Sequence, residues 1–350
     1  MKLVILGGKE SGTGAALLGQ KLGYDVFLSD KGVIEKTYKE ELNKAGIPFE
    51  EGQHTAERIY GADLVVKSPG IPDTVPLVAE LRNRGSEVIS EIEFAGRHTE
   101  ARMICITGSN GKTTTTLLTH HILKQAGLDV GLAGNVGASL AAQVAVEAHP
   151  VYVVELSSFQ LDGMFRFQAD IAVITNITPD HLDRYDHKFG NYVDSKFRIL
   201  QNMNDMPIKQ HSNFQTVAYM TRIAQEIKNA YPSLLLGILV NFTYTENRPG
   251  EGENYAGMEG DMVVVRLNAR EFRINKNEIS IKGRHNVYNA MAAILACMQM
   301  GIGFEAIAEG LRSFPQVEHR LETVAVIDGV TYINDSKATN VDSAWYALDS

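Results

Sequence analysis

Residues 104–114 read ICITGSNGKTT, an apolar run that passes through a glycine-containing turn into a threonine-rich segment. A strand, a turn of this kind and a helix together make a cradle for phosphate, because turn amides and the helix N-terminus point at anionic oxygens. Lys112 would add a positive charge, and the hydroxyl of Thr113 could ligate Mg²⁺. The strict pattern of such loops would place its first glycine at Ile106, so a plain strand–helix turn is the alternative.

Composition limits the class of protein. The 350 residues allow two or three domains, and 44% hydrophobic with 21% charged residues is typical of a soluble globular protein. A net charge of −9 argues against broad binding to nucleic acid or to an anionic membrane. Cys105 and Cys297 lie in apolar runs and are expected to be reduced core residues. The N-terminal MKLVILGG is too short for a signal peptide and no apolar run reaches membrane-spanning length, so a cytoplasmic location is the default expectation.

Residues 1–92 alternate short aliphatic runs with helical segments, which predicts a parallel, doubly wound sheet. The turn of residues 7–14 is rich in glycine and Asp30 ends the second strand, as in a dinucleotide-binding unit, but the G-x-G-x-x-G spacing is absent. A nicotinamide cofactor is therefore not favoured, while another nucleotide-like ligand and a structural turn both stay open. The expected strands are Lys2–Leu6, Asp25–Leu28, Leu64–Val66 and Glu87–Ile89, and the expected helices are Ala15–Leu22, Ile34–Lys44 and Val75–Arg84.

A second α/β region begins near Phe94, and Phe314-Pro315 marks its far boundary. The expected strands are Met103–Thr107, Val130–Leu132, Val151–Leu156 and Ile171–Asn176, with a hairpin of Met262–Leu267 and Glu271–Ile274. The expected helices are Thr113–Gln125, Phe189–Asn202, Gln215–Ala230, Asn286–Met300 and Glu305–Leu311, and residues 250–254 are expected to be a loop. Strands Val324–Ile327 and Val330–Asn334 and a helix Val341–Leu348 then begin a third domain, in too few residues to bury a core, which predicts a truncated product.

Several polar residues follow the phosphate loop in positions suited to chemistry. Glu155 ends an apolar strand, where a carboxylate could hold Mg²⁺ beside phosphates; a solvated strand-end acid is the alternative. His181 lies in a polar loop and could be a metal ligand, as could Asp180 and Asp183. Lys196, taken alone, is expected to be a surface lysine on a helix.

Two asparagines and a charged junction complete the set. Asn286 and Asn289 lie three residues apart at the start of a helix, which places both amides on one face, where they could cap the helix or bind a base or ribose. Glu318-His319-Arg320 and the run 334–340 gather charge around the inferred domain junction, as a salt-bridged hinge would.

Taken together, these segments resemble the Mur ligase family, the ATP-dependent amino-acid ligases of peptidoglycan synthesis. The resemblance covers residues 1–202 and 280–350 and is not found across 203–260. ELSSFQLD with NDSKATN is most similar to the member that adds D-glutamate to UDP-N-acetylmuramoyl-L-alanine. The segments that carry the resemblance are TGSNGKTT (107–114), ELSSFQLD (155–162), NITPDHLDRY (176–185), SKFRIL (195–200), GRHNVYNAMAA (283–293), EHRLE (318–322) and NDSKATN (334–340).

The resemblance implies an α/β fold in three parts. Residues 1–92 would form a Rossmann-like domain that binds the UDP-sugar, residues 93–317 a central P-loop-type ATPase domain with a mostly parallel sheet, and residues 318–350 the start of a C-terminal domain that holds the amino acid. The implied reaction is ATP-dependent amide-bond formation through an acyl phosphate, with ATP and two Mg²⁺ ions. The implied partners are the two small-molecule substrates alone, with no nucleic acid and no membrane, and the chain is expected to be a monomer.

The resemblance also implies roles for individual residues. Lys112, Lys196 and His181 would be catalytic, with Lys196 carbamylated by CO₂ so that it ligates metal. The metal ligands would be Thr113, Glu155, His181 and Lys196. ATP would be bound by Gly108, Ser109, Asn110, Gly111, Lys112, Thr113, Thr114, Asn286, Asn289, Arg320, Asp335 and Lys337. The UDP-sugar would be bound by Asp30, Lys31, Ser68, Pro69, Gly70, Asn135, Gly137, Ser157, Ser158 and Gln160.

Two alternatives stay open. One is a shortened, non-catalytic form that binds the UDP-sugar and ATP without joining an amino acid. The other is a folate-polyglutamate-type ligase, which shares the phosphate loop and the Mg²⁺ chemistry but resembles the N-terminal domain less.

Overall fold

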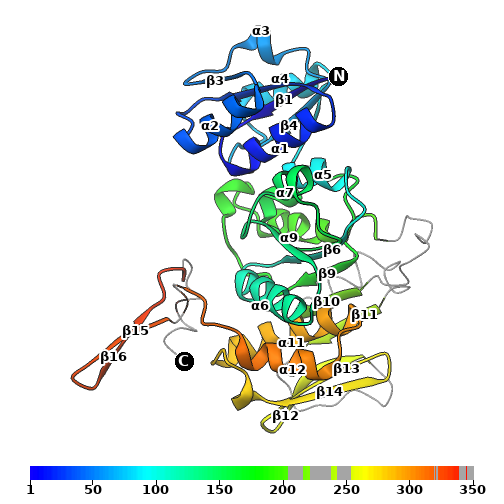
Figure 1. Ribbon diagram of the computed structural model, residues 1–350, viewed down its shortest axis with the longest axis vertical. Coiled ribbons are helices and arrows are strands. Elements are labelled where there is room, and N and C mark those ends of the chain that lie inside the picture. Colours follow the sequence, from blue (N-terminus) through cyan, green and yellow to red (C-terminus); the bar gives the residue numbers. More distant parts are fainter. Residues whose placement is uncertain are drawn as a thin grey trace. The chain divides into compact units, whose positions relative to one another are not determined.

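The computed structural model of this chain describes residues 1–203, 216–220, 238–242, 254–318, 320, 322–338 and 344. They form two compact units, each a mixture of helices and strands (Figure 1). Unit 1 comprises the described residues of Met1–Cys105, Asp129–Ala169 and Leu182–Pro207. Unit 2 comprises those of Ile106–Leu128, Asp170–His181 and Ile208–Ser350. The division into domains at residues 92 and 317 stays a prediction.

Unit 1 begins with a five-stranded sheet in the order β3-β2-β1-β4-β5, in which every pairing is parallel. The doubly wound sheet expected from the alternating pattern is therefore confirmed. Its strands are β1 (Lys2–Leu6), β2 (Asp25–Asp30), β3 (Phe49–Glu51), β4 (Leu64–Lys67) and β5 (Glu87–Ile89). Its helices are α1 (Glu10–Lys21), α2 (Lys36–Ala45), α3 (Ala56–Ile59) and α4 (Pro76–Asn83).

The order of these strands fixes where a ligand can enter. The chain leaves β1 for β2 on one side and later crosses to β4 on the other, so the topological switch point lies between β1 and β4. In open parallel sheets the crevice at the carboxyl ends of the strands beside this point is where ligands bind. The apolar residues of β1, which are completely buried from Leu3 to Leu6, form the floor beneath it.

Unit 1 continues with a helix and a pair of parallel strands. Helix α5 (Glu91–Gly96) follows β5, and the first residues of β6 (Arg102–Thr107) follow that helix. Strand β7 (Val130–Gly134) pairs in parallel with β8 (Val151–Glu155), from Val130 opposite Val151 to Gly134 opposite Glu155. The remaining elements are α7 (Leu140–Val146), α8 (Ser158–Leu161), η1 (Leu182–Arg184), α9 (Phe189–Phe197) and η2 (Arg198–Leu200).

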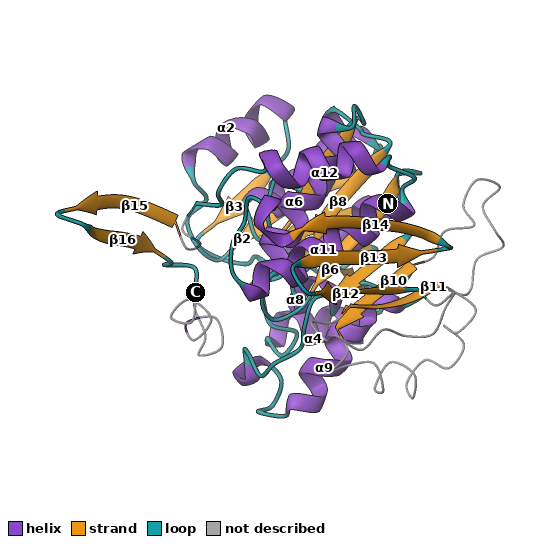
Figure 2. Ribbon diagram, turned by 90° about the horizontal axis from the view of Figure 1, so that it is seen from below, coloured by secondary structure: helices purple, strands orange, loops and turns teal. Residues whose placement is uncertain are grey.

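Unit 2 contains the end of β6 and a run of strands in the order β14-β13-β12-β11-β10-β9. The pairings from β9 to β12 are parallel, and β12, β13 and β14 are antiparallel and lie side by side in Figure 2. Helix α11 packs against α6 and β13, and α12 against α6. The strands are β9 (Ile171–Ile174), β10 (Thr216–Met220), β11 (Ile238–Phe242), β12 (Tyr255–Glu259), β13 (Met262–Leu267) and β14 (Arg270–Asn275). The helices are α6 (Lys112–Gln125), η5 (Lys276–Glu278), α11 (Arg284–Gln299) and α12 (Phe304–Ser313).

One expected helix is wrong. Residues 216–220 were expected to lie in the helix Gln215–Ala230, but they form strand β10, which pairs in parallel with β9 and with β11. A short run of β-branched and aromatic residues does not distinguish a buried strand from a helix by its periodicity, and the two neighbouring strands decide it. The rest of that expected helix, residues 250–253 of the expected loop and all but Ala344 of the helix Val341–Leu348 lie outside the described residues.

The last described strands form an antiparallel hairpin, β15 (Glu322–Ile327) and β16 (Val330–Asn334), as expected from the sequence. Its apolar side chains are largely exposed, from 48% at Tyr332 to 64% at Val326. Within the part of the chain that the structure describes, no helix combines the length and the hydrophobicity needed to cross a membrane. Cys105 and Cys297 are both buried thiols outside any disulfide bond, as expected.

Candidate active site

The phosphate loop of unit 2 adopts a backbone that only glycine allows at two positions. Gly108 has φ +145° and Gly111 has φ +82°, and a Cβ at Gly111 would lie 2.3 Å from Asn289 Oδ1. Gly111 is also the N-cap of α6, and no side chain caps that helix. The first N–H groups of an α-helix have no partner within the helix, and such groups can bind an anion. The loop and helix expected from the sequence are therefore present.

The phosphate loop is held by hydrogen bonds to residues that follow β9. Asn176 accepts a hydrogen bond from Asn110 N at 2.9 Å and returns one from its Nδ2 to Asn110 O at 2.9 Å. Ser109 Oγ donates to Thr178 O at 2.8 Å, and Thr178 N donates back to Ser109 Oγ at 2.9 Å. These contacts fix the loop's shape before any ligand arrives. Asn176 was not among the expected site residues, although it begins the motif NITPDHLDRY.

Lys112 lies over its own loop. Its ammonium donates to Gly108 O at 2.9 Å and to Ser109 O at 2.8 Å. These are loop carbonyls, so the ammonium would have to exchange them for phosphate oxygens in order to bind a nucleotide. The four-carbon stem of lysine permits that exchange without a change in the backbone.

Three other residues expected to contact ATP meet the same loop and helix. Asn289, which is 6% exposed, accepts from Thr115 Oγ1 at 3.3 Å and donates to Asn286 Oδ1 at 3.0 Å. Arg320 donates from its guanidinium to Thr113 Oγ1 at 3.1 Å. The structure thus brings Asn286, Asn289 and Arg320 to the start of α6, with the two amides linking α11 to α6.

The remaining expected residues of unit 2 lie in loops. His181 has φ +50°, its side chain is 56% exposed, and its Nε2 lies 3.7 Å from Asp180 Oδ2. Asp335 lies close enough to His285, at the start of α11, to act on its ring: burial lowers the pKa of His285, and the Asp335 carboxylate opposes that change. Lys337 is exposed in the loop after β16.

In unit 1, Glu155 is a buried carboxylate with one satisfied oxygen. It ends β8 and is 1% exposed, and its Oε1 accepts from Asn135 Nδ2 at 2.8 Å. Among the described residues, Oε2 has no hydrogen-bond partner. The alternative of a solvated strand-end acid is therefore wrong. A buried carboxylate oxygen without a donor is suited to a cation, because it otherwise bears an uncompensated desolvation cost.

Lys196 is also buried, which contradicts the surface lysine expected from its local sequence. Its side chain is 1% exposed, and its Nζ lies 5.3 Å from the ring centroid of Tyr192, one turn earlier on α9. A buried amine is costly in its charged form unless a neighbouring group balances the charge.

The residues Ser157 and Gln160 have a local structural role. Ser157 is the N-cap of α8 and forms a capping box with Gln160, in which Gln160 N donates to Ser157 Oγ at 3.3 Å and Ser157 N donates to Gln160 Oε1 at 2.9 Å. The spacing Ser-x-x-Gln is the sequence signature of such a box. Ser158 is buried, and its carbonyl accepts from Ser195 Oγ at 3.1 Å.

The N-terminal crevice gathers several of the residues expected to bind the UDP-sugar. Asp30 accepts from Gly8 N at 2.6 Å and from Gly32 N at 2.7 Å, so it joins the turns that follow β1 and β2. Ser68, at the end of β4, lies so close to Gly7 that a Cβ there would be 2.7 Å from Ser68 Cβ. Lys31, Pro69 and Gly70 continue these two turns at the surface or half-buried.

Asn135 and Gly137 lie in the loop between β7 and α7. Gly137 has φ +82°, and a Cβ there would lie 2.3 Å from Leu132 O. The loop is tied to the N-terminal sheet's first helix, because Ser139 N donates to Glu10 Oε1 at 3.1 Å. Within unit 1, the structure therefore links this loop to the element that borders the N-terminal crevice.

No cluster of three His, Cys, Asp or Glu side chains suited to a metal occurs in the ranges that the structure describes. The expected metal set is of a different kind, since it combines Glu155 and His181 with a threonine hydroxyl and a modified lysine. The observation that supports a cation for this set is that Glu155 Oε2 is buried without a hydrogen-bond partner among the described residues.

Sequence comparison decides the family. The sequence model of the Mur ligase middle domain matches residues 106–297, and that of the MurD N-terminal domain matches residues 6–75. The chain belongs to the Mur ligase family. It is 50% identical over 350 residues to a UDP-N-acetylmuramoylalanine–D-glutamate ligase of Bacteroides fragilis, covering 100% of this chain and 76% of that protein. It is likewise 50% identical over 348 residues to the enzyme of that name from Porphyromonas gingivalis, covering 99% of this chain and 75% of the relative.

Solved Mur ligases share the fold. A UDP-N-acetylmuramate:L-alanyl-gamma-D-glutamyl-meso-diaminopimelate ligase from Neisseria meningitides matches with a TM-score of 0.60 at 21% identity, covering 91% of this chain and 99% of that chain. A UDP-N-acetylmuramate-alanine ligase from Thermotoga maritima matches with a TM-score of 0.54 at 21% identity, covering 100% of this chain and 79% of that chain. The α/β architecture expected from the resemblance is therefore confirmed.

Proposed function

We propose that this Mur ligase joins D-glutamate to UDP-N-acetylmuramoyl-L-alanine at the expense of ATP, in the synthesis of peptidoglycan precursors. The observation that carries the proposal is the 50% identity over the whole chain to ligases of that name, on a chain whose phosphate loop is folded and braced. A carboxylate is a poor electrophile. Transfer of the γ-phosphoryl group to it releases ADP and gives an acyl phosphate, and attack by the amine of D-glutamate then forms the amide and releases phosphate and a proton.

The chain's own residues would act on the nucleotide first. The N–H groups at the start of α6, together with Gly108, Ser109, Asn110, Gly111 and Thr114, would surround the phosphates, and Lys112 would leave its loop carbonyls to balance their charge. Asn286 and Asn289 would lie on the adenine side, and Arg320, Asp335 and Lys337 would contact ATP when the hinge closes.

The residues present fit a divalent cation. Mg²⁺ would neutralise charge on the phosphates and the attacking carboxylate. Glu155 would supply the orphaned Oε2 and Thr113 its hydroxyl. His181 and a carbamylated Lys196 would hold a second ion. Carbamylation would convert the amine of Lys196, which is 1% exposed, into an anion that a cation can balance.

The UDP-sugar would occupy the switch-point crevice of the N-terminal sheet. Asp30, Lys31 and the turn Ser68-Pro69-Gly70 border it, and Asn135 and Gly137 extend the binding surface on the β7–α7 loop. Ser157, Ser158 and Gln160 would line the same channel through α8, with the capping box holding their backbone in place. The chain is proposed to act as a monomer in the cytoplasm, where UDP-sugars and ATP are available.

Phosphate release tests the proposal. Release from ATP is measured with UDP-N-acetylmuramoyl-L-alanine, with and without D-glutamate, and release that requires both substrates is the expected result. UDP-sugar binding by calorimetry without release would favour the non-catalytic form. Release with a folate in place of the UDP-sugar would favour the folate-polyglutamate type, and neither binding nor release would refute the assignment.

A further inference from the structure

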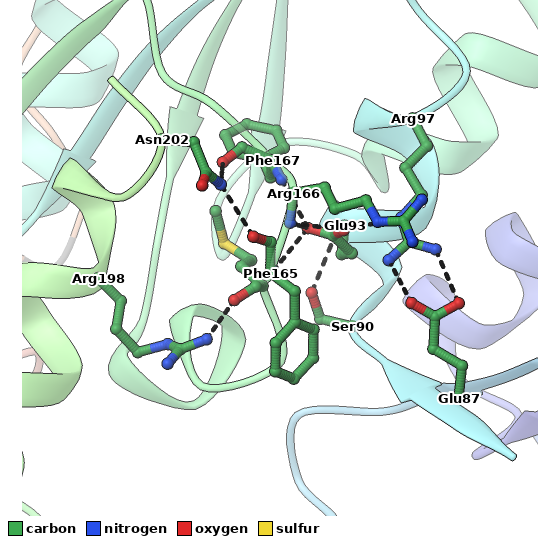
Figure 3. A network of polar contacts seen from close by, with 10 residues as sticks. Glu87, Ser90, Glu93, Arg97, Phe165, Arg166, Phe167, Arg198 and Asn202 are labelled. Carbon is green, nitrogen blue, oxygen red and sulfur yellow. Dashed lines mark hydrogen bonds and ion pairs between the residues drawn. The ribbon is translucent and has the colours of Figure 1, made fainter. Parts of the chain in front are cut away.

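The last three amides of the segment Leu161–Phe167 are held by one buried carboxylate (Figure 3). Glu93, on α5, is completely buried and accepts hydrogen bonds from the N–H groups of Phe165 at 2.9 Å, Arg166 at 2.9 Å and Phe167 at 2.8 Å. Arg97 Nε balances the charge of Glu93 at 2.7 Å. Successive backbone amides that converge on one carboxylate fix the path of a segment that has no regular structure.

The carbonyls of the same segment are held by residues that follow Lys196. Arg198 Nε donates to Leu161 O at 2.8 Å, and a second guanidinium nitrogen donates to Met164 O. Asn202 Nδ2 donates to Phe165 O at 2.9 Å and to Phe167 O at 3.1 Å. Figure 3 shows Arg198 and Asn202 on one side of the segment and Glu93 with Arg97 on the other.

Two contacts fix the position of Lys196, which is on α9, relative to α8. Ser195, the residue before it, donates to Ser158 O at 3.1 Å, and Arg198, two residues after it, donates to Leu161 O. Lys196 is therefore bracketed by two hydrogen bonds to carbonyls at the start and the end of α8. Neither residue needs to touch a ligand to do this.

We propose that Arg198 is a positioning residue for Lys196, which it holds in register by binding the carbonyls of Leu161 and Met164 while Glu93 anchors the same segment from the opposite side. The proposal deepens the function above and rests on it for the catalytic use of Lys196. The amine of Lys196 would carry a metal-binding group, so it tolerates little displacement. Loss of an outer contact of a metal site costs about 10–100-fold in activity.

The test compares Arg198→Met with Arg166→Met in the full chain. Both substitutions remove a guanidinium from the same region, but the Arg166 side chain is exposed: its backbone N–H donates to Glu93, and its charge acts on Glu87, on the side of the network away from Arg198 (Figure 3). Arg198→Lys is the conservative variant. Its ammonium can donate to one of the two carbonyls, but it cannot reproduce the forked guanidinium that binds both. It also keeps the proposal testable if the methionine variant does not fold.

Two measurements are made on each variant. The first is D-glutamate-dependent phosphate release, separated into kcat and KM. The second is reductive methylation of lysines, read by mass spectrometry as the ratio of Lys196 to Lys67, which is a second buried lysine of unit 1. The second measurement does not depend on ligase activity.

Arg198→Met is expected to lower kcat at least about tenfold, to leave KM for the UDP-sugar within about threefold of wild type, and to raise the methylation ratio. Arg166→Met is expected to change neither kcat nor the methylation ratio. Arg198→Lys is expected to recover part of the lost activity. Equal behaviour of the two methionine variants would overturn the proposal. Methylation that rises at both lysines together with a lowered melting temperature would also overturn it, since it would mean a general loss of stability. If wild type releases no phosphate the proposed function fails, and the methylation ratio alone then decides on Arg198.

Discussion

Replacing Glu91 by glutamine is expected to remove a large pH dependence from the stability of unit 1. Glu91 opens α5 and is 3% exposed, and its Oε1 accepts from Ser139 Oγ at 2.8 Å and from Ala141 N at 2.6 Å. Burial raises the pKa of this carboxyl from 4.5 to about 7; the two hydrogen bonds oppose the rise, and the charge of Glu10 adds to it. Glutamine keeps the accepting oxygen and has no proton to release.

The sign and size of this pH dependence follow from the linkage between proton binding and folding. A carboxyl whose pKa is higher in the folded than in the unfolded chain stabilises the fold at low pH, and that stability is lost as the pH rises through the folded pKa. A shift from 4.5 to about 7 therefore makes the wild-type free energy of unfolding fall by about 2.5 kcal/mol between pH 5 and pH 8. Glu91→Gln lacks this contribution, so it should be more stable than wild type at pH 8 and similar to it at pH 5.

The assay is urea unfolding followed by circular dichroism at both pH values. Glu147→Gln is the matched control, because Glu147 is an exposed residue at the end of α7, the helix whose start contacts Glu91. Other groups also titrate over this range, so the informative quantity is the difference in pH dependence between variant and wild type. If wild type, Glu91→Gln and Glu147→Gln all change by the same amount from pH 5 to pH 8, the reasoning is refuted.

Four further predictions concern the proposed site. Lys112→Ala should abolish D-glutamate-dependent phosphate release, and near-normal turnover would refute the assignment of the phosphate loop. Glu155→Gln should raise the Mg²⁺ concentration for half-maximal activity at least about tenfold, and an unchanged Mg²⁺ titration would contradict a metal role for the orphaned oxygen. Lys196→Ala should be inactive and partly rescued by added short carboxylates, whereas no rescue would count against the carbamate. Gly111→Ala should weaken ATP binding by calorimetry at least about tenfold, because φ +82° and the 2.3 Å approach to Asn289 Oδ1 exclude a Cβ; wild-type affinity would show that the loop tolerates one.

Predictions from local sequence were correct where a strong hydrophobic or turn pattern coincided with a helix or a strand. The sequence predicts four of the five strands of the N-terminal sheet, and the strand, turn and helix of the phosphate loop, because aliphatic runs, glycine turns and helix starts agree there. It missed β3, which has three residues, two of them glutamates, and takes its strand form from pairing with β2. The capping box at Ser157 was readable from its spacing, although only a substrate-lining role was expected of it.

The sequence by itself determined the parallel sheets, the glycine-dependent phosphate loop and the family, because these depend on short-range patterns and on motifs in a fixed order. Only the tertiary structure decided that Lys196 and the Glu155 carboxylate are buried, that residues 216–220 form a strand, and that Glu93 and Arg198 hold one loop from opposite sides. Burial and long-range hydrogen bonds depend on segments far apart in the chain. A lysine or an arginine on a short helix carries no local sign of which distant backbone will surround it.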